Sequence, residues 1–127
     1  MKFLLQYLFV GAAGALGAMT RLGVSQFVGR FGFTFPVATH FINISGSLFL
    51  GWFLAFASGR LGSSDYARLA IATGFVGAYT TFSTFMVESD GLLRDANFWR
   101  AALYLLGSLF LGLLAALSWG TGDFGGG

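Results

Sequence analysis

Residues 73–85 read TGFVGAYTTFSTF, and they carry the most informative pattern in the chain. It lies in a charge-free segment, Leu69–Val87, so Gly77–Thr80 would fall at the centre of a membrane that the segment crossed. Its glycines and β-branched threonines weaken a helix, and a break would free carbonyl oxygens, which are ligands for hard cations. The residues favour equally a continuous helix whose hydroxyls bond to the preceding turn.

The composition of the whole chain places this stretch in a membrane. Of 127 residues, 56% are hydrophobic, 18% are aromatic and only 9% are charged. Soluble domains carry about 25% charged residues, and so short a chain cannot hide this much apolar surface from water. A soluble enzyme, a disordered segment and a disulfide scaffold are therefore excluded. The seven basic residues are scattered and form no patch, so we expect no nucleic-acid partner.

Three further charge-free stretches are long enough to cross a hydrocarbon core, which takes about 20 helical residues. They are Phe3–Thr20, Phe31–Gly59 and Ala101–Gly122. The first continues too far for a signal peptide. The sequence predicts an all-α, multi-pass protein of the cell (inner or plasma) membrane. It forms one domain, residues 1–127, with transmembrane helices at about 3–28, 35–58, 66–90 and 97–119.

The loop charges do not fix the orientation of the chain in the membrane. Lys2, Arg60 and Arg68 fall on one side, and Arg30, Arg94 and Arg100 fall on the other, with Arg21 towards that second side. Orientation normally follows an excess of Lys and Arg in the loops. Two interpretations stay open: a fixed orientation set by other features, and insertion both ways followed by pairing as an inverted dimer.

Glycine makes up 20 of the 127 residues, and most of it lies inside the spans. Small residues let helices approach closely in lipid. The candidate contact faces contain Gly11, Gly14, Gly17, Gly46 and Gly51. Because four short helices bury too little volume to enclose a pathway, we expect the chain to oligomerise.

Polar residues inside membrane spans are functional candidates by default. Thr39, Asn43 and Ser47 share one helix face through their i, i+4, i+8 spacing. Phe82 and Phe85 are i, i+3 neighbours, and an aromatic ring has a positive edge that attracts an anion. The predicted lining is rich in hydrogen-bond donors, has no acid in its middle and therefore suits an anion. Its members are Thr39, Asn43, Phe82, Ser83, Thr84, Phe85, Tyr104 and Ser108.

Four residues in or near this lining have simpler interpretations as well. Asn43 alone could make an ordinary interhelical hydrogen bond. Arg21 could concentrate anions at a mouth. Glu88 lies near the end of the third span, where a solvated or snorkelling acid is the ordinary expectation. His40 is interpreted as an inert helix-contact or interfacial residue, and no role is assigned to it.

Three motifs, in order along the chain, resemble those of the Fluc (CrcB) family of fluoride channels. They are GALGAMTR at Gly14–Arg21, the stretch Thr39–Asn43 with Gly46, and residues 73–85 followed by Glu88. The resemblance covers nearly the whole chain. The run TTFSTF, with a glycine three residues ahead of it, is its most specific part.

The resemblance implies a passive fluoride channel: an antiparallel, dual-topology homodimer with two pores and a third helix broken near its centre. It implies a structural Na⁺ bound by the backbone carbonyls of Gly77 and Thr80 from each copy. It assigns ring-edge fluoride contacts to Phe82 and Phe85 and the neighbouring donor to Asn43. The pore walls would contain Thr39, Ser83, Thr84, Tyr104 and Ser108. Arg21 would be a structural or vestibular cation and Glu88 a residue at the end of the gate.

The sequence departs from the family pattern at three positions. Met86 and Gly112 stand where members often have serine, and Tyr79 is bulkier than the usual residue. These departures bear on conductance and pore hydration rather than on the identity of the ion.

Three other classes remain as alternatives. A small multidrug-type antiporter needs a membrane-buried carboxylate, and the first span has none. A proton-coupled fluoride carrier would use Glu88. A glycine-packed assembly subunit would carry no ion. No enzymatic activity is expected, because the sequence has no nucleophile–base pair, cofactor loop or metal cluster.

Overall fold

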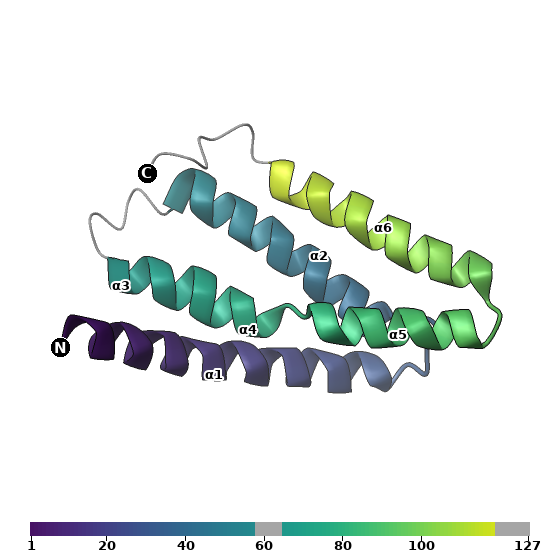
Figure 1. The fold of residues 1–127 in the computed structure, drawn as a ribbon, viewed down its shortest axis with the longest axis horizontal. Coiled ribbons are helices and arrows are strands. Elements are labelled where there is room, and N and C mark those ends of the chain that lie inside the picture. Colours follow the sequence, from purple (N-terminus) through teal and green to yellow (C-terminus); the bar gives the residue numbers. More distant parts are fainter. Residues whose placement is uncertain (58–64, 119–127) are drawn as a thin grey trace.

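The structure is a computed structural model and describes residues 1–57 and 65–118, in which all the regular secondary structure is helical (Figure 1). The elements are α1 (Lys2–Gly29), α2 (Val37–Trp52), the π-helix η1 (Phe53–Ala57), α3 (Asp65–Arg68), the π-helix η3 (Leu69–Val76), α4 (Gly77–Tyr79), α5 (Phe82–Arg94) and α6 (Phe98–Leu117).

Four helical runs are long and apolar enough to cross a membrane, so the predicted all-α, four-span fold is confirmed. These runs are Lys2–Gly29, Val37–Phe56, Tyr66–Arg94 and Phe98–Leu117. The predicted ends at residues 58 and 119, and the loop containing Arg60, lie outside the described residues.

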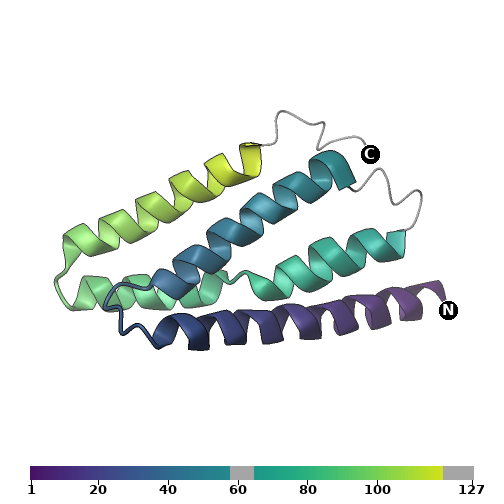
Figure 2. The same ribbon diagram turned by 180° about the vertical axis from the view of Figure 1, so that it is seen from behind.

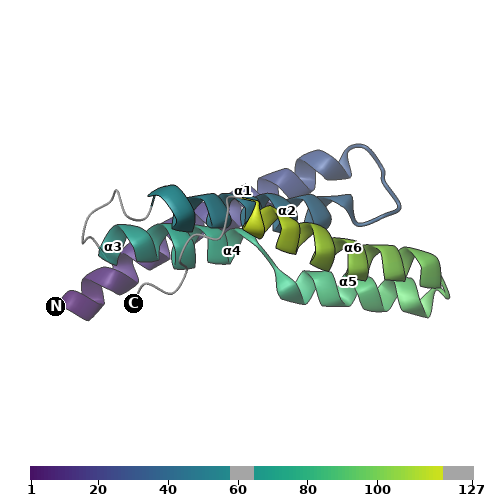
Figure 3. The same cartoon turned by 90° about the horizontal axis from the view of Figure 1, so that it is seen from above.

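The spans lie side by side as a bundle (Figures 1 and 2). α1 packs along η3 and α4, while α2 and α5 both pack on α6. Seen from above, α5 leaves the line of α3 and α4 and lies beside α6 (Figure 3). The third span therefore joins the two sides of the bundle, its first half against α1 and its second half against α6.

Several glycines allow helices of the same chain to approach closely. A Cβ atom at Gly17 would collide with the Phe75 carbonyl, and one at Gly74 would come within 2.8 Å of the Val10 carbonyl. Gly51 meets Ala116 in the same way. Gly11, by contrast, has open space around it. Gly17, Gly51 and Gly74 thus pack the protomer itself, whereas Gly11 stays open on the outside of α1.

Most of the apolar surface faces outward. Only 6% of the most apolar part of α1 is buried, and the largest fully buried side chains are Tyr104, Phe53 and Ile42. Such a wide apolar exterior would be a liability in water, whereas hydrocarbon is its natural surrounding.

The helical backbone of the third span is interrupted at two residues. α4 ends at Tyr79, Thr80 has an extended backbone with ψ 158°, and Thr81 is extended at φ −148° and ψ 121°. The helix resumes at Phe82. In the stretch TGFVGAYTTFSTF the two adjacent β-branched threonines occupy the extended positions, which suit their stiff side chains.

Candidate functional site

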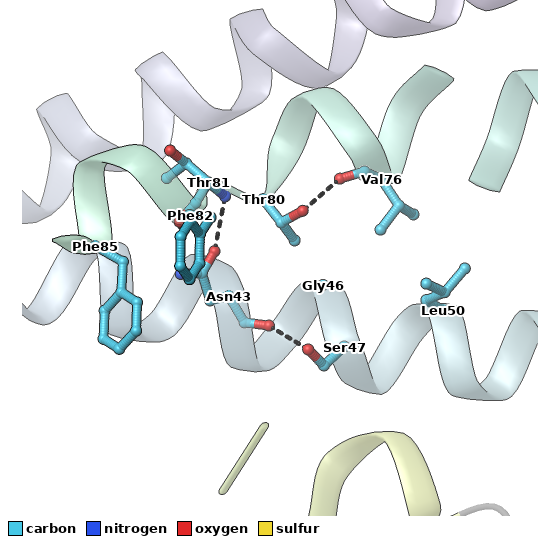
Figure 4. A pocket seen from close by; sticks show the side chains of 9 residues that line it. All are labelled: Asn43, Gly46, Ser47, Leu50, Val76, Thr80, Thr81, Phe82 and Phe85. Carbon is cyan, nitrogen blue, oxygen red and sulfur yellow. Dashed lines mark hydrogen bonds between the residues drawn. The ribbon is translucent and has the colours of Figure 1, made fainter. Parts of the chain in front are cut away.

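The Asn43 side chain holds the interrupted backbone from the neighbouring span. Its Nδ2 donates to the Thr81 carbonyl at 3.0 Å, and its Oδ1 accepts from the Thr81 N–H at 2.9 Å. Figure 4 shows Asn43 on α2 pointing at Thr81. The amide thus satisfies both polar groups of a residue that has left the helix, which is the requirement for non-helical backbone at membrane depth.

Thr81 in turn begins the next helix. Its Oγ1 accepts from the Thr84 N–H at 3.3 Å, which is an N-cap, and its hydroxyl donates to Thr84 Oγ1 at 3.1 Å. In a continuous helix the N–H groups of Thr81 and Thr84 would donate to the carbonyls of Gly77 and Thr80. Because both donate elsewhere, these two carbonyl oxygens lose their usual helical donors.

Arg21 donates a hydrogen bond to a third carbonyl beside the interruption. Its Nε donates to the Ala78 carbonyl at 3.2 Å from α1. A cation at this position complements the negative C-terminal end of the helical run that finishes at Tyr79. The structure therefore places Arg21 against the interruption, in a helix-capping position.

A cavity of about 240 Å³ lies beside the interruption (Figure 4). It is lined by Asn43, Gly46, Ser47, Leu50, Val76, Thr80, Thr81, Phe82 and Phe85. The two phenyl rings at its end have centroids 6.3 Å apart and planes 62° apart, so they meet edge to face. Phe85 is 5% exposed, whereas Phe82 is 72% exposed, so the pair leads from the interior of the protomer to its surface.

A second polar cluster gathers around Glu88. Its Oε1 accepts from the Thr39 hydroxyl at 2.8 Å, and its Oε2 accepts from the Tyr104 hydroxyl at 2.7 Å. Glu88 is thus not the freely solvated acid of the simplest interpretation. We call the predicted hydroxyls of Thr39, Thr84, Tyr104 and Ser108 the polar track. Two of them, those of Thr39 and Tyr104, bond to the Glu88 carboxylate, so the polar track has an acid at this end.

Aromatic rings connect the two clusters. The Phe85 and Tyr104 rings lie 5.0 Å apart at 76°, and Phe35 meets the other side of Tyr104 at 5.4 Å and 80°. Phe35 precedes α2 and was not among the predicted residues. Its sequence signal is weak, because a phenylalanine beside Pro36 gives no indication of which helix it will face.

The remaining predicted residues lie around these clusters. Ser108 is half-buried on α6 and pairs with His40 Nδ1 at 2.9 Å, so sequence analysis missed a contact of His40 with the lining. Ser83 is exposed on α5. Ser47 donates to the Asn43 carbonyl on its own helix at 2.8 Å, which is the ordinary behaviour of a helical serine.

The three departures from the family pattern are accommodated locally. Tyr79 is buried, its hydroxyl pairs with Ser45 Oγ at 2.8 Å and its ring stacks on Phe75. At Gly112 a Cβ atom would lie 3.8 Å from Ser47 Oγ, an ordinary contact distance. Met86 is half-buried on α5.

Together, the fold and the site define a class: a small four-span membrane protein with an interrupted third span beside a polar and aromatic cavity. The family model described as CrcB-like protein, Camphor Resistance (CrcB), matches residues 8–121. The chain belongs to the CrcB family. It is a multi-pass protein of the cell membrane.

Two relatives illustrate the similarity. The chain is 45% identical over 115 residues to the fluoride-specific ion channel FluC 2 of Moorella thermoacetica, an alignment that covers 89% of this chain and 93% of the relative. It is 39% identical over 105 residues to the fluoride-specific ion channel FluC of Aquifex aeolicus. That alignment covers 82% of this chain and 85% of the relative.

Proposed function

We propose that this protein is a fluoride-selective channel that lets fluoride leave the cell passively, down its electrochemical gradient. The relatives' names support the ion, and the edge-to-face pair of Phe82 and Phe85 beside Asn43 is the observation that carries the site. The relatives are named as ion channels, so no enzymatic chemistry is part of this proposal.

The chemistry of this lining suits a small anion. Fluoride is strongly hydrated, so a selective path has to replace its water with well-placed donors and still let the ion leave. The hydroxyls of Thr84 and Ser108 can supply such donors, whereas the Tyr104 hydroxyl already donates to Glu88. The ring edges supply positive charge without a polar group. Chloride is larger and fits the same donors less well in a narrow path.

A second copy of the chain completes the path in this proposal. Because Phe82 is 72% exposed, one protomer leaves the outer ring of the phenyl pair open at its surface. The balanced loop charges are compatible with insertion both ways, so the second copy is antiparallel and the dimer has two pores. The partners are then fluoride, lipid and a second copy.

A structural Na⁺ fits the interruption. The carbonyls of Gly77 and Thr80 have lost their helical donors to Asn43 and Thr81, and free carbonyl oxygens are suitable ligands for a hard cation. One pair from each copy would hold the ion at the dimer axis. Its positive charge would offset the partial negative charge of these oxygens, and the shared ion would hold the third spans of the two copies together.

The second candidate function is proton-coupled fluoride transport. It is favoured by Glu88, a carboxylate that holds the hydroxyls of Thr39 and Tyr104 within the span. A Glu88→Gln variant separates the two functions, because the glutamine side chain is neither protonated nor deprotonated near neutral pH. A channel keeps a fluoride flux that a proton gradient does not drive in this variant, whereas a carrier loses the coupling of fluoride flux to a proton gradient.

The direct experiment is efflux from liposomes. Purified protein is reconstituted and fluoride release is recorded with a fluoride electrode, with protein-free liposomes and chloride-loaded liposomes as controls. The proposal predicts fast fluoride release and slow chloride release. Equal rates for the two halides would refute selectivity, and fluoride release no faster than from protein-free liposomes would refute transport.

A further inference from the structure

His40 on α2 reaches across to the polar track on α6. Its Nδ1 lies 2.9 Å from Ser108 Oγ, and the ring is half-buried between Phe35 and Tyr104, each 6.3 Å away between ring centroids. It is the single histidine of the chain. A side chain that both donates and accepts is thus paired with a hydroxyl of the proposed fluoride path.

We propose that His40 is a positioning residue that sets the direction of the Ser108 hydroxyl hydrogen, and so decides whether Ser108 can donate to the passing anion. This inference rests on the proposed function, because it needs Ser108 to face fluoride.

The hydroxyl of Ser108 is available for this role. Serines within helices commonly donate to the carbonyl four residues earlier, and Ser47 and Ser89 do so here. For Ser108 the hydrogen bond found in the described residues is the one to His40. Its hydrogen is therefore directed either to the Nδ1 lone pair or into the track.

The protonation state of the ring selects between these directions. Neutral imidazole with its hydrogen on Nε2 accepts the Ser108 hydrogen at Nδ1, which turns that hydrogen away from the ion. In the imidazolium form Nδ1 carries a hydrogen and donates to Ser108 Oγ, which leaves the Ser108 hydrogen free for an anion. Acidification thus adds one donor to the track.

The other ionisable groups near this pair are identifiable. On the facing helices they are Tyr104 and Glu88, joined by a 2.7 Å hydrogen bond. Arg100 on α6 donates to Thr34, and Arg21 on α1 donates to the Ala78 carbonyl. Because Glu88 and Tyr104 are ionisable as well, a pH effect has to be assigned through variants of His40 and Ser108.

The first arm of the test observes the hydrogen bond itself. Tag-free protein labelled with ¹⁵N-histidine is measured by solid-state NMR in lipid, where the single histidine gives an unambiguous signal. We expect a neutral ring with its hydrogen on Nε2 at high pH and an Nδ1 signal that moves in Ser108→Ala. A hydrogen on Nδ1 at high pH, or an Nδ1 signal unchanged by Ser108→Ala, would overturn the proposal.

The second arm measures fluoride current in planar bilayers, because neutral HF carries no current. Between about pH 8 and about pH 5, the wild-type current should rise as the His40 ring gains its proton. The expected rise is roughly two- to tenfold, which corresponds to about 0.4–1.4 kcal/mol. His40→Asn, whose amide donates without titrating, should give a high current that is flat with pH, and Ser108→Ala a low current that is also flat.

The outcomes separate this inference from the proposed function. A pH-dependent current that persists in Ser108→Ala, or a flat wild-type current, would overturn the role of His40 and leave the channel intact. No fluoride current at any pH would instead refute the channel, and the NMR arm would still decide the hydrogen bond.

Discussion

At the scale of single residues, the most informative contact is the pair of hydrogen bonds between Asn43 and the backbone of Thr81. Leaving a buried donor or acceptor unpaired costs about 1–3 kcal/mol. Asn43 offsets that cost for both polar groups of Thr81, and this is how an extended residue can persist between two helices in a membrane.

Replacing Asn43 with alanine should therefore lower the thermal stability of the protein and its fluoride efflux together. The expected loss of stability is about 1–3 kcal/mol for each unpaired group, measured as a shift of the melting temperature in detergent. Ser47→Ala is the matched control, because Ser47 lies one turn away and, among the described residues, its hydroxyl bonds to its own helix. Equal shifts in the two variants would contradict this role for Asn43.

The two phenylalanines should differ in what their loss does. Phe85→Ala removes a side chain that is 5% exposed, and truncating a buried phenylalanine costs about 3–5 kcal/mol. Phe82→Ala should leave the melting temperature nearly unchanged, yet abolish fluoride efflux from liposomes. A folded Phe82→Ala dimer that conducts fluoride at the wild-type rate would remove Phe82 from the path.

At the scale of elements, the first half of the third span is fixed against α1 by glycine contacts. Gly17 lies against the Phe75 backbone and Gly74 lies against Val10, so η3 packs at backbone distance. This close packing anchors one end of the interruption, while α5 is anchored separately against α6.

A methyl group at Gly17 should push α1 and η3 apart. Overpacking of this kind costs about 1–3 kcal/mol, so Gly17→Ala should lower the melting temperature. Gly11→Ala on the same helix meets nothing within 4 Å and should be neutral or slightly stabilising, because alanine favours a helix. The contact is disproved if both variants melt alike.

The four spans could be predicted from sequence because length and apolar composition are local properties. Asn43 could also be recognised as a candidate site residue, because it is a polar residue in an apolar helix. Its partner could not, since the meeting of Asn43 with Thr81 depends on how α2 and the third span are aligned. The same reason hid the contacts of Glu88 with Thr39 and of His40 with Ser108.

At the scale of the whole molecule, the loop cations lie at the two ends of an apolar bundle. Lys2 begins α1 and Arg68 ends α3, and these two helix ends lie at the end of the bundle with the N-terminus (Figure 1). Arg30 follows α1, Arg94 ends α5 and Arg100 lies in the first turn of α6, and these helix ends lie at the opposite end. Neither end has the strong excess that would hold it in the cytoplasm. We therefore expect both orientations to occur in one membrane.

A single cysteine at position 99 tests this prediction, because the chain has no cysteine of its own. Trp99 is 83% exposed at the beginning of α6. In intact cells a membrane-impermeant maleimide should label about half of the Trp99→Cys copies, as balanced loop charges require, and a permeant maleimide should label all of them. Labelling of all or none by the impermeant reagent would show one fixed orientation.

The most direct test of the central claim is the reversal potential of the wild-type protein in a planar bilayer, with fluoride on one side and an equal concentration of chloride on the other. If the channel is selective for fluoride, the reversal potential should be large. Its sign should be the one that opposes fluoride flow, with the fluoride side positive. A reversal potential near zero would mean that both halides pass equally and would contradict the account.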